Sequence, residues 1–142
     1  MNENQIGTLI VESAIRIHQE LGPGLLESVY EAVLSHALEK KGLTVQRQVA
    51  IPIVFDGHHF SEGFRADLIV NGIVIVELKS IEKPNPAHRK QVLTYLKLTN
   101  LKLGYLLNFG EALMTSGIVR LVNGLPDAPP CVSAPLREHL KP

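Results

Sequence analysis

The feature that most constrains the fold is a short segment, Ile73–Leu78, which is apolar on both faces of an extended chain. A strand of this kind is stable where other elements cover it on both sides, as in the centre of a layered sheet. Its apolar run, Ile73–Val76, is far shorter than the roughly 20 residues that a membrane-spanning helix needs. The segment therefore predicts a covered central strand and no association with a membrane.

The residues before this strand predict two helices and a hairpin. Apolar side chains recur with helical spacing over 5–20 and over 25–42, and Gly22-Pro23-Gly24 separates the two stretches. Two segments rich in β-branched residues follow, Val45–Phe55 and Phe60–Val70. They end at Asp-Gly and Asn-Gly pairs, which are typical of hairpin turns. Together with the central strand they predict an antiparallel meander of three strands.

The residues after the central strand predict a crossover. Prolines at 84 and 86 break the chain, Ala87–Asn100 has helical spacing, and Leu103–Phe109 is another apolar strand. A strand–helix–strand connection within one sheet is right-handed and makes its strands parallel. Gly117–Val122 is a candidate edge strand. We therefore predict an α/β fold of the order α-α-β-β-β-α-β, with a mixed sheet flanked by helices.

The 142 residues predict one domain and a tail. Residues 1–122 form the predicted domain, and a content of 45% hydrophobic and 20% charged residues is typical of globular chains. Residues 123–142 hold five of the nine prolines and predict an extended arm or a disordered tail. A single cysteine, Cys131, excludes an internal disulfide and a cysteine-based metal site. The first residues lack the pattern of a signal peptide, so a cytoplasmic location is expected.

A formal net charge of zero conceals an uneven distribution of charge. Residues 1–39 contain six glutamates and one arginine, whereas residues 79–102 contain six lysines and arginines and one glutamate. Two interpretations stay open. Both segments could be solvated helix faces, or the basic segment could be an anion-binding surface, with carboxylates elsewhere for a metal.

Glu77 and Lys79 end the central strand two residues apart, so both point to one face of the sheet. Charges near a core are costly unless they are paired or bound to a metal, and a salt bridge at the strand end is the simpler alternative. Asp67, on the preceding strand, joins them only in some registers. A two-residue Asn71-Gly72 turn puts it on the opposite face, whereas a three-residue Val70–Gly72 loop or a strand bulge puts it on theirs.

These three side chains together suit the hydrolysis of a phosphodiester. Two carboxylates bind a hard divalent cation through oxygen, and magnesium is the usual one. Such a cation polarises a phosphoryl oxygen and lowers the pKa of a bound water. A neighbouring lysine can orient that water or offset the charge that develops on the phosphate.

Asp67 and the step Glu77–Lys79 resemble the motif of the PD-(D/E)xK nuclease superfamily. Gln91–Tyr95 looks like the QxxxY motif of its RecB-like branch, and Gly24–Tyr30 matches the name-giving motif of the small GxxExxY family. The resemblance covers roughly residues 5–122. It implies a restriction-endonuclease-like core and metal-dependent cleavage of nucleic acid.

The resemblance also implies a role for each matching residue. Asp67 and Glu77 would be ligands of Mg²⁺ or Mn²⁺, and Lys79 would be the catalytic lysine. Glu27 would be the helix carboxylate that completes or supports the metal site. Alternatively, Glu27 is only a favourable charge in the first turn of a helix.

Three tyrosine and glutamine side chains would support this site. Gln91 and Tyr95 lie four residues apart on one helix face, so both can contact the substrate backbone or brace the site. Tyr30 lies one turn from Glu27 and can orient it. Both tyrosines fit equally well as core residues of amphipathic helices.

The histidines lead to separate expectations. His18, beside the Gly-Pro-Gly turn, is expected to make a structural hydrogen bond, and His58 and His59 are expected to be exposed at a hairpin tip. His88 lies one turn before Gln91, where it could approach a substrate phosphate, or it could be uninvolved.

Three functions from different classes remain. The first is a metal-dependent nuclease acting on DNA or RNA, which would need a homodimer, a protein partner or a structured substrate for specificity. The second is a catalytically silent nucleic-acid-binding or assembly module with the same fold. The third is a structural protein whose charges form salt bridges. The set of acidic residues favours the nuclease, because a phosphate-binding site has no use for two buried carboxylates.

Overall fold

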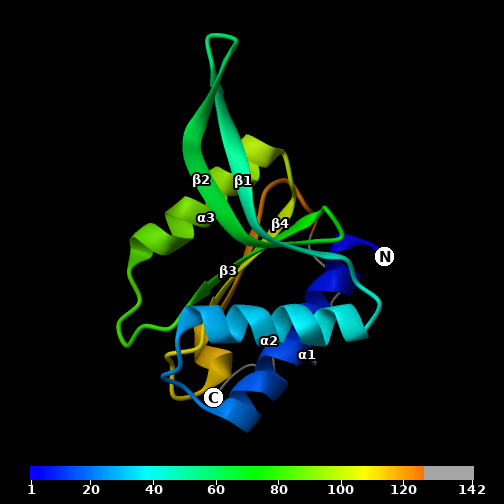
Figure 1. Ribbon diagram of the computed structural model, residues 1–142, viewed down its shortest axis with the longest axis vertical. Coiled ribbons are helices and arrows are strands. Elements are labelled where there is room, and N and C mark those ends of the chain that lie inside the picture. The colour runs from blue at the N-terminus through cyan, green and yellow to red at the C-terminus, as the bar shows by residue number, and fades with distance from the viewer. Residues whose placement is uncertain (127–142) are drawn as a thin grey trace.

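Within residues 1–126, three helices and five strands follow one another in the predicted order, with the candidate edge strand last (Figure 1). The computed structural model describes residues 1–126, so most of the predicted tail, residues 127–142 with Cys131, lies outside the described residues. No helix within residues 1–126 is long and apolar enough to cross a membrane. The elements are α1 (Glu3–Leu21), α2 (Glu27–Lys40), β1 (Val45–Phe55), β2 (His58–Val70), β3 (Val74–Lys79), α3 (Pro86–Thr99), β4 (Leu103–Asn108), the 3₁₀ turn η1 (Met114–Gly117) and β5 (Ile118–Val122).

The strands form one sheet in the order β1-β2-β3-β4-β5, so β3 is the central strand. β3 and β4 are parallel and are joined by α3, whereas the other neighbouring strands are antiparallel. Val74–Leu78 is buried throughout, and Lys79 at the strand end is partly exposed. The predicted central strand and mixed sheet are therefore confirmed.

α1 and α2 cover one face of the sheet, and α3 covers the other (Figure 1). Along β3, Val76 and Leu78 pack with α1 and α2, while Ile75 packs with α3. Glu77 and Lys79 follow Ile75 at intervals of two, so they lie on the α3 face. This face carries the smaller of the two apolar clusters.

The start of α3 and one glycine of β4 place the helix over the end of β3. The Asn85 side chain caps α3 by accepting a hydrogen bond from the Ala87 amide, and Pro86 fits the first turn. The helix crosses β4 at Gly104, where an added Cβ would lie 3.0 Å from Val92 Cγ1. The absence of a side chain at this position lets α3 pack closely against the sheet.

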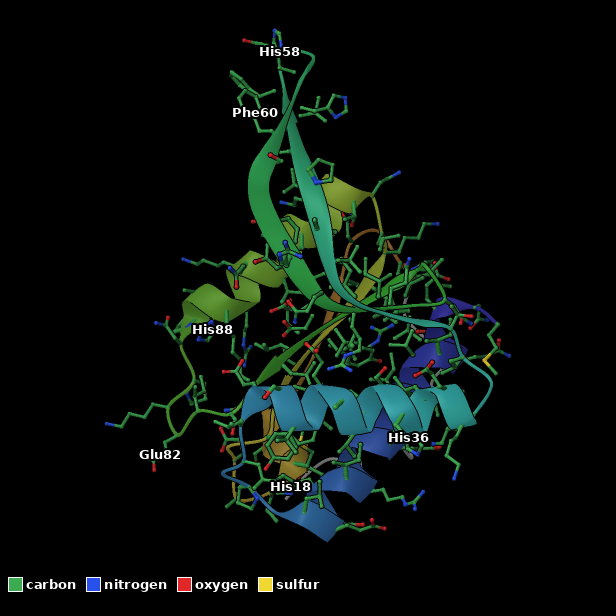
Figure 2. The ribbon with its side chains drawn as sticks, in the orientation of Figure 1. His18, His36, His58, Phe60, Glu82 and His88 are labelled. Carbon is green, nitrogen blue, oxygen red and sulfur yellow. The ribbon has the colours of Figure 1, made fainter. Side chains whose placement is uncertain are left out.

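β1 and β2 continue beyond the sheet as a long twisted hairpin (Figure 1). Its turn is formed by Asp56 and Gly57, whose φ angles of 53° and 75° match the predicted Asp-Gly turn. His58 and His59 are exposed beside it, as expected, and Figure 2 shows His58 and Phe60 near the tip.

Candidate active site

The turn between β2 and β3 decides whether Asp67 can meet Glu77. The ladder begins with Val70 opposite Val74, so the loop spans residues 71–73. Its Asn-Gly pair has φ angles of 49° and 70°, as in a type I′ turn, and one extra residue follows that pair. The expected three-residue loop is therefore present, one residue later than predicted. This register puts Asp67 on the same face as Glu77.

Asp67 and Glu77 face each other where the β2–β3 ladder ends. The last ladder pair is Leu68 with Val76, and one further step brings Asp67 opposite Glu77. Here the Asp67 amide donates to Glu77 Oε1 at 3.0 Å, and the Leu78 amide donates to Asp67 Oδ2 at 2.9 Å. The two carboxylates therefore accept hydrogen bonds that strand carbonyls would accept in an unbroken ladder.

The surroundings of this pair disfavour the ionisation of both carboxyl groups. Glu77 is buried, whereas Asp67 is partly exposed. Burial raises the pKa of Glu77 from 4.5 to about 8, the Asp67 carboxylate adds to the rise, and the Lys79 ammonium opposes it. Lys79 is thus close enough to act on Glu77 but does not neutralise the pair. The pair needs further positive charge before both carboxylates can ionise at neutral pH.

Gln48 of β1 is a site residue that the sequence analysis did not single out. Its φ of 51° lies in the left-handed region, which favours glycine and is strained for a glutamine within a strand. It stands across from Asp67 in a gap of the β1–β2 ladder. Its side-chain amide donates to Asp67 Oδ1 at 3.1 Å and also to Glu31 Oε1. The distorted backbone thus presents one amide to two carboxylates.

The helix carboxylate in this network is Glu31, which the sequence analysis also missed. Glu31 is buried in α2, forms an ion pair with Arg47 at 3.0 Å and accepts a hydrogen bond from Gln48. Glu27, the residue predicted for this role, lies one turn earlier and is exposed. Within residues 1–126, no group of three or more His, Cys, Asp or Glu side chains is placed to hold a metal ion. Glu27 therefore does not join the carboxylate pair in this structure.

Tyr30 connects the start of α2 to the end of β3. It is fully buried and stacks on Phe109, with ring centroids 4.3 Å apart. Its hydroxyl donates to the Gly22 carbonyl and accepts from the Leu25 amide. The Leu25 carbonyl accepts from Ser80 Oγ, directly after β3, at 2.7 Å. Tyr30 is therefore a core residue that also positions the loop before Glu27.

Tyr95 and Gln91 approach the carboxylate pair from α3. Tyr95 is buried and stacks on Phe64 of β2. Burial raises the pKa of the Tyr95 hydroxyl to about 12, the Glu77 charge adds to the rise, and a hydrogen bond with the exposed Gln91 opposes it. The hydroxyl is therefore neutral near pH 7 and can donate a hydrogen bond to an anion.

His88 lines a cavity, and His18 forms a buried hydrogen bond. His88 lies at the start of α3 (Figure 2). It lines a cavity of about 270 Å³ together with Lys79. An approach of His88 to a substrate phosphate therefore stays a prediction, and a His88 uninvolved in the site remains the alternative. His18 is buried, and its Nε2 forms a hydrogen bond with the Glu111 carbonyl at 2.8 Å, which confirms the expected structural role.

A family model described as the PD-(D/E)XK nuclease superfamily matches residues 4–121, which is most of the chain. The mixed α/β sheet flanked by helices is consistent with the restriction-endonuclease-like fold that this match implies. No curated protein and no solved structure matches the chain.

Proposed function

Because the chain belongs to the PD-(D/E)XK nuclease superfamily, we propose that it is a metal-dependent nuclease that hydrolyses phosphodiester bonds of DNA or RNA. One observation carries the proposal: Asp67 and Glu77 meet at the open end of the β2–β3 ladder, with Lys79 on the same face. The segment Gly24–Tyr30 supports the further assignment to the small GxxExxY family.

The donor chemistry of the carboxylate pair fits Mg²⁺ or Mn²⁺. Each Asp67 oxygen accepts one N–H and keeps a second lone pair, and Glu77 accepts one N–H at Oε1. Carboxylate oxygens are the ligands that hard divalent cations prefer. Burial and, after it, the charge of Asp67 raise the pKa of Glu77, and a bound cation would favour its ionised form. Asp67 and Glu77 are therefore the proposed protein ligands of the metal.

The proposed mechanism assigns the remaining chemistry to Lys79 and α3. When bound, the cation would supply a polarised phosphoryl oxygen and a water of lowered pKa. The Lys79 ammonium, at the last position of β3, can donate to a phosphate oxygen and offset the charge that develops there. The neutral Tyr95 hydroxyl and the Gln91 amide can donate hydrogen bonds that orient the substrate backbone.

Two supporting contacts hold this arrangement in place. The Gln48 amide bonds to Asp67 and is itself held by Glu31, so the Asp67 carboxylate has a defined orientation. Tyr30 holds the loop that leads into α2, and Glu27 follows at the first turn. Glu27 is therefore proposed as a carboxylate that supports the site from the start of α2, outside the pair itself.

Cleavage assays test the proposal directly. With Mg²⁺ or Mn²⁺, the purified protein is expected to cut at least one of single-stranded, duplex and structured DNA and RNA. Lys79→Ala should slow cleavage by about 10²–10⁴-fold and largely spare metal binding, because Lys79 acts in the transition state. Lys41→Ala removes the same charge from an exposed position after α2 and should keep full activity. The proposal fails if nothing is cut, or if Lys79→Ala cuts as fast as wild type.

A catalytically silent nucleic-acid-binding or assembly module is the second candidate. The observation that favours it is the presence of two carboxylates, rather than three, at the site formed within residues 1–126. Calorimetry with Mg²⁺ and Mn²⁺ should compare wild type with Asp67→Asn. Metal binding that depends on Asp67, without cleavage of any substrate, would support this module, acting as a homodimer or with a protein partner.

A further inference from the structure

The cavity beside Lys79 lies on the α3 face of the sheet, next to the proposed site. Its floor is formed by Leu106 of β4 and Val119 of β5, which are neighbours in the sheet. The start of α3 forms one wall, and residues 111–117 form the other. At about 270 Å³, it lies just below the range of roughly 300–1,000 Å³ typical of small-ligand pockets. It has room for a single nucleotide and none for a segment of stacked duplex.

The rim of the cavity combines positive charge with an apolar floor. Lys79 and Arg89 line it with His88, and Arg89 is exposed. Glu111, on the opposite wall, is the one carboxylate among the lining side chains within residues 1–126. A phosphate would therefore be attracted to the Lys79–Arg89 side and repelled from the Glu111 side. An apolar floor beneath cations suits a ligand with a flat ring and an anionic group.

The segments around Ile81 and Asn108, which also line the cavity, are held together before any ligand binds. The Asn108 side chain accepts from the Ile81 and Gly110 amides and donates to the Ile81 carbonyl, each at 3.0 Å. A Cβ at Gly110 would collide with the Ile81 backbone, so the two segments can approach this closely only because position 110 is glycine. The connector after β3 and the loop after β4 are thus fastened together, and a ligand would not need to order them first.

We propose that this cavity binds one unpaired nucleotide adjacent to the scissile phosphate, which makes single-stranded or frayed nucleic acid the preferred substrate. The inference rests on the proposed function, because that function places the scissile phosphate at Lys79. Because Lys79 also lines the cavity, a nucleotide that is covalently joined to that phosphate can place its base in the cavity. Its base contacts the Leu106–Val119 floor, and its flanking phosphate contacts Arg89. A paired base cannot enter without first leaving its stack, which disfavours duplex.

Binding in EDTA tests the cavity separately from catalysis. The probe is a fluorescent single-stranded oligothymidylate, with a duplex of the same length for comparison, and binding is followed by anisotropy. Ser116→Phe fills the cavity from an exposed rim position and should weaken single-strand binding about tenfold, the scale of one lost base-stacking contact. Arg89→Ala should weaken it similarly and reduce its salt dependence. Lys97→Ala removes a matched charge from α3 outside the cavity and should have less effect than either.

The outcomes separate this inference from the proposed function. If wild type cuts single strands faster than duplex, and both cavity variants weaken single-strand binding, both proposals stand. If wild type cuts nothing, but single-strand binding depends on Ser116 and Arg89, the cavity assignment stands and the nuclease proposal fails. If wild type cuts duplex and single strand equally, with both cavity variants binding as wild type, the nuclease proposal stands and the cavity assignment is overturned.

Discussion

The two faces of the sheet differ, although the same strands build both. Toward α1 and α2, neighbouring strands contribute mostly apolar side chains such as Leu78 and Leu107, and the core is continuous. Toward α3 the same strands end in Glu77, Lys79 and Asn108, and part of the core is replaced by a cavity. Buried charge is destabilising unless it is compensated. The comparison therefore indicates that one face supplies most of the apolar packing, while the other keeps costly polar groups, where we propose that the chemistry takes place.

The largest effect is expected from Glu77→Gln, which removes a proposed ligand from the polar face and keeps its shape. Metal affinity and cleavage should fall together by more than about 100-fold, since losing a ligand exceeds the 10–100-fold cost of losing an outer contact. Calorimetry with Mn²⁺ and a cleavage assay measure the two effects. Glu82→Gln changes an exposed carboxylate five residues later, which projects away from the molecule in Figure 2, and should leave both unchanged. Wild-type metal affinity in the Glu77→Gln protein would contradict the ligand assignment.

Two adjacent leucines of β4 test whether the two faces of the sheet are packed differently. Leu107 is fully buried against α1 and α2, whereas Leu106 forms the cavity floor. Leu107→Ala should lower the free energy of unfolding by about 2–5 kcal/mol, the cost of a new hole in a closed core. Leu106→Ala should cost less, because that side chain already borders a cavity. Urea unfolding measures both, and equal losses would show that the two faces are equally packed.

The pH dependence of stability should also separate the faces. Below its ordinary pKa of 4.5, Glu77 is protonated in the folded and the unfolded chain. Between 4.5 and about 8 the unfolded chain ionises while folded Glu77 keeps its proton, so unfolding releases a proton and stability falls as pH rises. Urea midpoints in EDTA at several pH values should show this fall in wild type. In Glu77→Gln the urea midpoint should depend less on pH. An unchanged dependence would show that another group causes the fall.

Much of the fold was predictable because it follows from local chemistry. The apolar Ile73–Leu78 segment predicted a covered central strand, and the Asp-Gly pair at residues 56–57 predicted the hairpin turn. The same local rules left the β2–β3 register open. The Asn-Gly turn was recognised, but the extra residue after it, Ile73, was not, because nothing in its identity distinguishes a strand residue from a bulge.

The candidate site was predictable only where a motif marks it. Asp67, Glu77 and Lys79 stand out because charges interrupt apolar strands. Glu31 carried a usable signal: it precedes Leu34 and Leu38 at helical spacing, so a carboxylate occupies the buried stripe of α2. Gln48 carried no such signal, since its left-handed backbone arises from contacts between α2, β1 and β2 rather than from its neighbours in sequence.

The smallest effects are expected at Gln48, where strain and chemistry can be separated. Gln48→Gly removes the amide but adopts a φ of 51° freely, so its unfolding free energy should stay within about 1 kcal/mol of wild type or rise. Cleavage should nevertheless fall about 10–100-fold, because Asp67 loses the amide that orients it.

Gln48→Ala is the matched variant, because it loses the same amide and keeps the unfavourable backbone angle. It should match Gln48→Gly in cleavage but be less stable by about 1 kcal/mol, which is the cost of a left-handed residue with a Cβ. Urea unfolding and cleavage rates on the same preparations give both numbers. Wild-type activity in both variants would show that Asp67 needs no partner on β1. An alanine variant more stable than the glycine variant would show that the backbone at Gln48 stores no strain.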